Sequence, residues 1–300
     1  MRIPPSPSSS LMLATTLAVL ALPAMVAAQD TSGVGDIGLT LGYNAVDDLD
    51  EDKAGVGFGV IEGSYSFHVA PRVLLGFDAN WRMDDLSSDP DFDSDDDPDS
   101  QYGLGMHALW ELSPDTRLGG FLAYGDTKMQ DEPRNDQYDY YLIGLEARHF
   151  VNDDLMLYGQ LATGDKGRNG QDDEEGFNDG KAVRLGATYF MGDQSAFTLD
   201  VEYATADPYI DGDDKGEFMG ATLSGETRLG TQAPLLATYY LRYDDLDSTT
   251  EGDKVTELSV GLGIKYVFGA NTPRDAARAG RSIGTPHLPA RASIWTEYLD

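Results

Sequence analysis

The sequence predicts an all-β protein: a transmembrane, up-and-down antiparallel β-barrel of about 12 strands, with long acidic outer loops and short periplasmic turns. Apolar and polar residues alternate with a period of two in many segments, for example Leu75–Arg82 and Leu258–Phe268. These segments are longer than ordinary soluble strands and can cross a bilayer when tilted. The connections between them alternate between long and short along the chain.

The N-terminus has the features of a secretory signal peptide. Arg2 is the only charged residue before Asp30, and an apolar run extends over Leu11–Ala28. A membrane anchor helix is the alternative, and it is disfavoured because Pro23 interrupts a run that would barely span a bilayer. The sequence therefore predicts a signal peptide over residues 1–28, which is cleaved at its end during export.

The predicted strands follow the signal peptide in order, and each has 9 to 14 residues. They span residues 34–44, 55–68, 72–83, 101–112, 116–125, 138–151, 155–163, 182–191, 195–205, 218–229, 233–243 and 255–268. In FTLDVEY, for instance, Phe197, Leu199 and Val201 alternate with Thr198 and Asp200. One face of each strand is thus apolar and the other polar, as a barrel in lipid requires.

The connections sort by length to opposite ends of the strands. The long ones cover residues 45–54, 84–100, 126–137, 164–181, 206–217 and 244–254. The short ones centre on residues 70–71, 113–115, 152–154, 192–194 and 230–232. Long outer loops and short periplasmic turns are typical of a membrane barrel, whereas a soluble sandwich has no reason to sort its loops by side.

The composition limits the partners of the chain. It carries 52 Asp and Glu residues against 21 Lys and Arg, a formal net charge of −31. Such an excess of negative charge argues against nucleic-acid binding through phosphate contacts and favours cationic solutes. The absence of cysteine excludes disulfide bonds and thiolate metal sites.

Most of the excess negative charge lies in the long loops, and the loop over residues 84–100 is the most acidic. We expect this loop to be hydrated and to attract cations through Asp89, Asp91, Asp93, Asp95, Asp96, Asp97 and Asp99. An EF-hand is excluded because the sixth and twelfth positions are Ser94 and Ser100 instead of Gly and Glu. The sequence thus predicts no cofactor and no metal site, with weak Ca²⁺ or Mg²⁺ binding by the loop as the alternative.

Charged residues on the polar strand faces are the candidate pore lining, because charges are costly on a lipid-facing surface. They are Glu62, Arg72, Asp78, Arg82, Glu111, Arg117, Glu146, Arg148, Arg184, Asp200, Glu202, Glu226, Arg228, Arg242, Glu257 and Lys265. Two interpretations compete: the charges pair and close the lumen, or they line a wet pore. Glycines on the same faces favour some opening, so we expect a narrow pore.

The pattern resembles the outer-membrane β-barrels of Gram-negative bacteria, the porin-like group. The resemblance rests on the alternating strands, the sided loops and the closing segment Gly263–Phe268 (GIKYVF), which is similar to the aromatic-ended final strand of that family. It implies a multi-pass protein of the outer membrane, a barrel over residues 29–269, and contact with lipid and lipopolysaccharide. The oligomeric state, monomer or trimer, stays open.

The chain departs from the family pattern after Phe268, where the final aromatic residue usually ends the protein. The remaining residues are rich in Ala, Arg and Pro. We expect residues 270–300 to form a flexible periplasmic tail. The alternative is a contact segment over Ala292–Leu299 (ASIWTEYL).

No catalytic motif stands out in the sequence. The chain has no G-x-S-x-G and no H-E-x-x-H pattern, so we expect no enzyme. The sequence predicts a porin-like channel for passive diffusion of small hydrophilic solutes, with a preference for cations. The alternative is a non-conducting structural or adhesion barrel whose acidic loops bind divalent cations or surface ligands. A soluble, acidic exported protein is a third interpretation.

Overall fold

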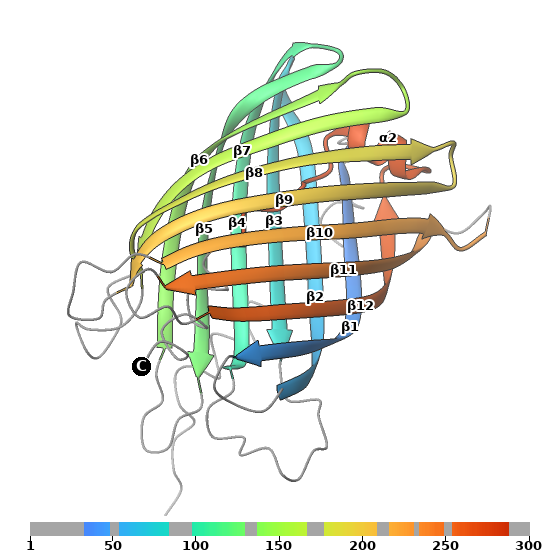
Figure 1. Cartoon of the computed structure of the whole chain (residues 1–300). Coiled ribbons are helices and arrows are strands. Elements are labelled where there is room, and N and C mark those ends of the chain that lie inside the picture. The colour runs from blue at the N-terminus through green and yellow to red at the C-terminus, as the bar shows by residue number, and fades with distance from the viewer. Residues whose placement is uncertain are drawn as a thin grey trace, which may run out of the picture.

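The computed structural model of the chain describes residues 33–48, 54–83, 98–129, 137–166, 177–208, 216–230, 234–248 and 254–287. Twelve strands close into one antiparallel barrel, in which each strand pairs with its sequence neighbours and β1 pairs with β12 (Figure 1). The strands are β1 (Val34–Asp48), β2 (Ala54–Ala70), β3 (Val73–Met83), β4 (Pro98–Ser113), β5 (Thr116–Met129), β6 (Gln137–Phe150), β7 (Leu155–Lys166), β8 (Phe177–Met191), β9 (Ser195–Pro208), β10 (Gly216–Arg228), β11 (Leu235–Ser248) and β12 (Lys254–Phe268). The fold class predicted from the sequence is confirmed.

The strands extend further into the long connections than the alternation predicts. β11, for example, ends at Ser248 instead of residue 243. In this region the polar ends of the strands stay paired; Asp47 of β1, for example, pairs with Thr256 of β12. Backbone hydrogen bonding needs no apolar side chains once the strands leave the hydrocarbon, so the alternation stops before the ladder does.

Side chains alternate between an apolar exterior and a polar interior. Every strand exposes large apolar side chains on its outward face, and the exposed fraction reaches 72% for Leu262 and 63% for Leu145. The inward neighbour Glu146 is only 1% exposed. Monomeric soluble proteins rarely expose so large an apolar surface, whereas contact with lipid accounts for it.

Inward glycines make room for aromatic rings against the wall. A Cβ atom at Gly144 would lie 2.3 Å from the Phe121 ring, and one at Gly186 would lie 2.1 Å from the Tyr158 ring. The space beside these glycines is therefore filled by a ring of the neighbouring strand. Polar-face glycines at these two positions do not widen the lumen, contrary to the expectation from the sequence.

The chain continues past the last strand into the interior of the barrel. After Phe268 it forms helix α2 (Pro273–Ala279), which ends at Gly280 with a φ of 101°. It then runs without regular structure to His287. Figure 1 shows α2 within the outline of the barrel, at the end with the short turns. Among the described residues, no helix has the length and apolar character needed to cross a membrane.

Two arginines and two alanines hold α2 at this end. Arg274 donates a hydrogen bond of 2.8 Å to Asp154, which lies in the β6–β7 turn. Arg278 donates one of 3.0 Å to Asp115 in the β4–β5 turn. Ala276 and Ala277 are buried against inward apolar side chains of the strands.

This placement differs from the flexible periplasmic tail expected for residues 270–300. The apolar face of α2 finds an apolar collar inside the barrel, and the segment after α2 meets hydrogen-bond donors of the wall. The sequence offers no sign of either partner, because both come from many different strands. Residues 288–300, which include the 292–299 segment, lie outside the described residues.

Candidate functional site

The candidate pore lining lies on the strands, with one exception. Arg72 is exposed in the β2–β3 turn, at a φ of 71°. β3 begins at Val73, because Pro71 and Arg72 form the tight turn itself. The prediction that Arg72 faces the lumen is therefore wrong. Whether the other residues line a conducting pore stays a prediction.

Most lumen arginines pair with a carboxylate on the same face. Along one strand, the period of two brings Glu146 and Arg148 together at 2.6 Å. Across strands, Arg184 of β8 lies 2.6 Å from Asp200 of β9. Further pairs with N–O distances of 2.7 to 3.0 Å are Arg117 with Glu111, Arg242 with Asp244 and Lys265 with Glu62. The register also aligns Glu146, Gln160, Arg184 and Glu202 in one row across β6 to β9.

These pairs surround space instead of filling the interior. The lumen holds a cavity of about 540 Å³. Its lining includes Glu62, Asp78, Arg184 and Lys265 of the wall, together with residues 281–287 of the terminal segment. A cavity of this size with charged groups in its lining can hold water and small solutes.

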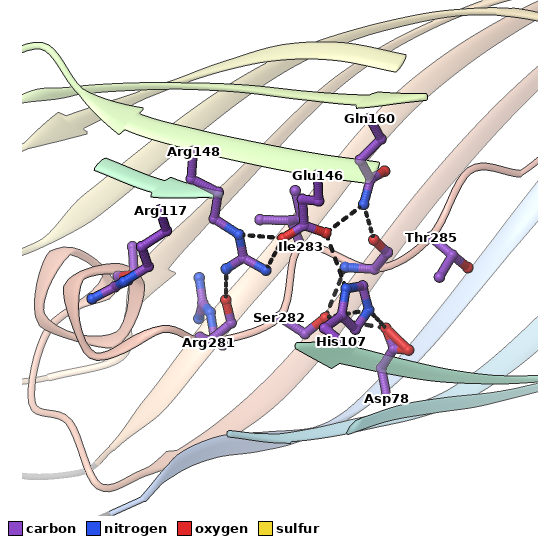
Figure 2. A network of polar contacts seen from close by, with 12 residues as sticks. Asp78, His107, Arg117, Glu146, Arg148, Gln160, Arg281, Ser282, Ile283 and Thr285 are labelled. Atoms are coloured by element: carbon purple, nitrogen blue, oxygen red, sulfur yellow. Dashed lines mark hydrogen bonds and ion pairs between the residues drawn. The ribbon is translucent and has the colours of Figure 1, made fainter. Parts of the chain in front are cut away.

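The wall holds the terminal segment through the backbone of that segment. Arg148 donates to the carbonyl oxygen of Arg281 at 2.6 Å, as Figure 2 shows. Arg184 donates to the carbonyl oxygen of Ile283 at 3.0 Å, and Gln160 donates to that of Gly284 at 2.8 Å. Arg117 reaches the carbonyl oxygen of Ala277 at the end of α2, at 3.2 Å. Charged and polar groups of neighbouring strands thus form a row of donors along the terminal segment.

Side chains of the terminal segment also bind the wall. Arg281 donates to Glu226 of β10 at 2.6 Å and lies 3.6 Å from Asp36 of β1. Burial alone would lower the pKa of Arg281, but Glu226 and Asp36 raise this pKa above its usual value. The guanidinium is therefore charged. The backbone amide of His287 donates to Glu202 at 2.8 Å.

A buried histidine lies at the centre of the network in Figure 2. Nδ1 of His107 lies 3.0 Å from Glu146, and its Nε2 lies 3.1 Å from Asp78. The Ser282 hydroxyl lies 3.4 Å from the same Nε2 and 3.1 Å from Asp78. This set contains the residue types of a serine hydrolase, but both imidazole nitrogens face carboxylates. Asp78 lies closer to Nε2 than the Ser282 hydroxyl does and competes with it for this nitrogen, so the geometry is that of a structural network.

The cation-attracting loop falls largely outside the described residues. This holds for Asp89, Asp91, Asp93, Asp95, Asp96 and Asp97, whereas Asp99 belongs to β4 without a described side chain. Within the described ranges, no group of three or more His, Asp or Glu side chains could hold a metal ion.

The polar strand faces in the sequence place His107 in the lumen, as the structure does, whereas sequence reasoning missed Asp36, Gln160 and Asp244. Asp244 was assigned to a loop, yet it is buried on the inward face of β11 and bonded to Arg242. Its position two residues after Arg242 is the signal that could have found it, because residues i and i+2 share a face. Asp36 has the same inward phase as the polar residue Thr40 of β1.

Comparisons with known proteins agree with this architecture. A family model described as "Outer membrane protein beta-barrel domain" matches residues 14–226. No curated protein shows significant similarity to the chain.

Solved structures give similar folds at low sequence identity. An outer membrane channel from Pseudomonas putida F1 is 11% identical, with a TM-score of 0.60 over 79% of this chain and 96% of that one. The toluene transporter TodX of Pseudomonas putida is 10% identical, with a TM-score of 0.44 over 81% and 90%. The porin KdgM is 8% identical, with a TM-score of 0.41 over 76% and 98%. At these identities the first likeness concerns the fold alone, and the other two carry no further argument.

Proposed function

Because the chain belongs to the outer membrane protein beta-barrel domain family, we propose that it is a narrow outer-membrane channel for the passive diffusion of small hydrophilic solutes, with a preference for cations. The outer membrane supplies the lipid that the apolar exterior contacts. Lipopolysaccharide on the outer leaflet is a further contact of such a barrel.

One observation carries this proposal: the lumen keeps a cavity of about 540 Å³ with charged side chains such as Glu62, Arg184 and Lys265 in its lining, although the terminal segment lies in it. A barrel that serves only as a scaffold would be expected to fill its interior with side chains. Here paired charges line the cavity and leave room for water, which is the environment that a small hydrophilic solute requires.

The charge of the inner wall supports a preference for cations. The inward carboxylates of the described strands are Asp36, Glu62, Asp78, Glu111, Glu146, Asp200, Glu202, Glu226, Asp244 and Glu257. The inward basic residues are Arg82, Arg117, Arg148, Arg184, Arg228, Arg242 and Lys265. The carboxylates outnumber the basic residues, so the field in the lumen favours positive ions.

Planar-bilayer recording tests the channel and its selectivity. Refolded protein should conduct, and its reversal potential in a KCl gradient should indicate a cation preference. Replacing Asp91, Asp93, Asp95, Asp96 and Asp97 by Asn should lower the cation/anion permeability ratio, because these charges concentrate cations at the outer mouth. Asp193→Asn in the exposed β8–β9 turn serves as the control. An unchanged permeability ratio in the loop variant would show that the loop does not set the cation preference.

The second candidate is a non-conducting structural or adhesion barrel, and the terminal segment inside the lumen favours it. Protein that migrates as a folded barrel on unheated gels yet carries no current would support this candidate. In that case the acidic loops would bind divalent cations or surface ligands.

A further inference from the structure

The terminal segment, residues Gly269–His287, is separable from the barrel that encloses it. The ladder between β1 and β12 is complete before the segment begins, since it runs from Asp48↔Val255 to Gly35↔Phe268. The segment adds no strand to the sheet. Removing it therefore breaks no strand pairing of the barrel. The binding of the segment in the lumen is an equilibrium separate from the folding of the barrel.

The contacts of the terminal segment differ in how specific they are. The donors Arg148, Gln160 and Arg184 bind its carbonyl oxygens, which every peptide offers. The contact of Arg281 with the wall is different, because it depends on the chemistry of one side chain. Its guanidinium lies between carboxylates of two strands that are far apart in the sequence, β1 and β10.

The two carboxylates around Arg281 have their close ion pairs with this residue. Asp36 and Glu226 are largely buried, with side chains 6% and 12% exposed. The nearest basic wall residue, Lys265, is bonded to Glu62 at 3.0 Å. Within the described part of the chain, Arg281 is the residue that forms an ion pair with Asp36 and Glu226. Without Arg281, these two desolvated carboxylates would keep only Lys265, which is bonded to Glu62, as a counter-charge, and such a site favours a bound cation.

The arrangement suits a guanidinium group in particular. Nη2 of Arg281 contacts Glu226 at 2.6 Å while its Nε lies 3.6 Å from Asp36, so two nitrogens of one planar cation face two separate carboxylates. A planar fork of donors serves two separate acceptors in this way, whereas an ammonium group acts as a point charge.

We propose that Asp36 and Glu226 form a binding pocket for a guanidinium group, that Arg281 fills this pocket from within the chain, and that a solute carrying the same group displaces the terminal segment and opens the lumen. This inference rests on the proposed channel function. A competing cation shifts the equilibrium only through its stronger binding to the open state, where the pocket is vacant. The channel would thus be gated by a class of its own cationic solutes.

Thiol labelling tests the displacement without any need for conduction. The chain contains no cysteine, so Thr285→Cys places a single thiol in the terminal segment. Guanidinium chloride at millimolar concentration should raise the labelling rate of the folded barrel in vesicles. Tetramethylammonium chloride at equal concentration, a cation without N–H donors, should not. Equal labelling rates in the two salts would refute the proposal that Asp36 and Glu226 bind a guanidinium group.

Variants of the pocket give the matched comparison. Arg281→Ala in the Thr285→Cys background should raise labelling roughly tenfold, the effect of losing a charged hydrogen bond of about 1.4 kcal/mol. Arg278→Ala removes the same charge from the same segment but breaks pairs with the exposed Asp115 and Asp153, so its effect should stay under about fivefold. With Asp36→Asn and Glu226→Gln combined, labelling should be fast and insensitive to guanidinium. Continued sensitivity of that variant would place the guanidinium site elsewhere and refute the proposal.

Conductance separates this inference from the channel proposal. A chain that ends at Ala270 should conduct more than the full chain and show no response to guanidinium. If the shortened barrel conducts as the full chain does, gating by the terminal segment is refuted, and the channel proposal is kept. If the shortened, folded barrel carries no current, the channel proposal fails, and the labelling experiment still decides whether the pocket exists.

Discussion

Substitution of Glu146 by Gln should strongly destabilise the barrel. Glu146 is 1% exposed and accepts hydrogen bonds from Arg148, at 2.6 Å, and from Gln160. Glu146→Gln keeps the shape of the side chain and leaves the buried Arg148 without its counter-charge. Loss of one partner of a buried ion pair costs about 3–5 kcal/mol. Arg148 keeps its bond to the Arg281 carbonyl oxygen, so we expect the lower end, about 3 kcal/mol.

Glu111→Gln is the matched control. It removes the partner of Arg117, but the Glu111 side chain is 23% exposed at the edge of the barrel. Water can replace the lost charge there, so the expected loss is about 1 kcal/mol or less. Both values follow from urea unfolding in lipid vesicles, measured by the fluorescence of the two described tryptophans, Trp81 and Trp110.

The unfolding free energies of Glu146→Gln and Glu111→Gln together test whether the buried network stabilises the barrel. If both lose the same free energy of unfolding, or if Glu146→Gln is as stable as the natural protein, the buried network does not stabilise the barrel. The double variant with Glu146→Gln and Arg148→Met supplies a further check. It should recover part of the loss, because it also removes the uncompensated charge.

Three other predictions concern the wall. Leu262→Arg places a charge on the lipid-facing side of β12 and should cost about 2–4 kcal/mol of unfolding free energy. The lumen-facing Thr238→Arg should cost less than about 1 kcal/mol. Similar costs for the two variants would contradict the assignment of the two faces. Gly119→Ala should impair folding, seen as loss of the fast-migrating band on unheated gels, because its Cβ would lie 1.9 Å from the Ala108 carbonyl oxygen. Gly159→Ala is the control, because its Cβ would meet no atom closer than the Leu185 side chain, at 3.2 Å, and this variant should migrate as the natural protein does. Equal migration of Gly119→Ala and Gly159→Ala would refute the predicted backbone clash. Asp244→Asn should lower the cation/anion permeability ratio, because Arg242 would keep only the more distant Glu202, at 3.9 Å, as a counter-charge. An unchanged ratio would show that the inner wall does not set selectivity.

The fold could be predicted because its signal is local and repeated. In β12, Leu258, Val260 and Leu262 are exposed while Glu257 and Ser259 are buried, as the alternation in the sequence indicates. Each strand carries its own copy of this pattern, so an error in one strand leaves the others intact. The same argument explains why Arg72 was misplaced. It lies at the end of a strand, where a single residue decides between the turn and the wall.

The lumen network could be predicted only in part. The sequence shows that Glu146 and Arg148 share a face, and their ion pair follows from that. It does not show that His107, which is 39 residues away, reaches Glu146. That contact depends on the curvature of the barrel and on which side chains cross the interior.

The sequence by itself determined that this chain forms a membrane barrel and, for most strand residues, which face of the wall each side chain occupies. A period of two and a sorted series of loop lengths carry this information residue by residue. Only the tertiary structure decided where the residues after Phe268 go. Their partners, among them Arg148 of β6, Arg184 of β8 and Glu226 of β10, meet in one place only after the sheet has closed. A binding surface assembled from many strands leaves no mark on the short segment that it binds.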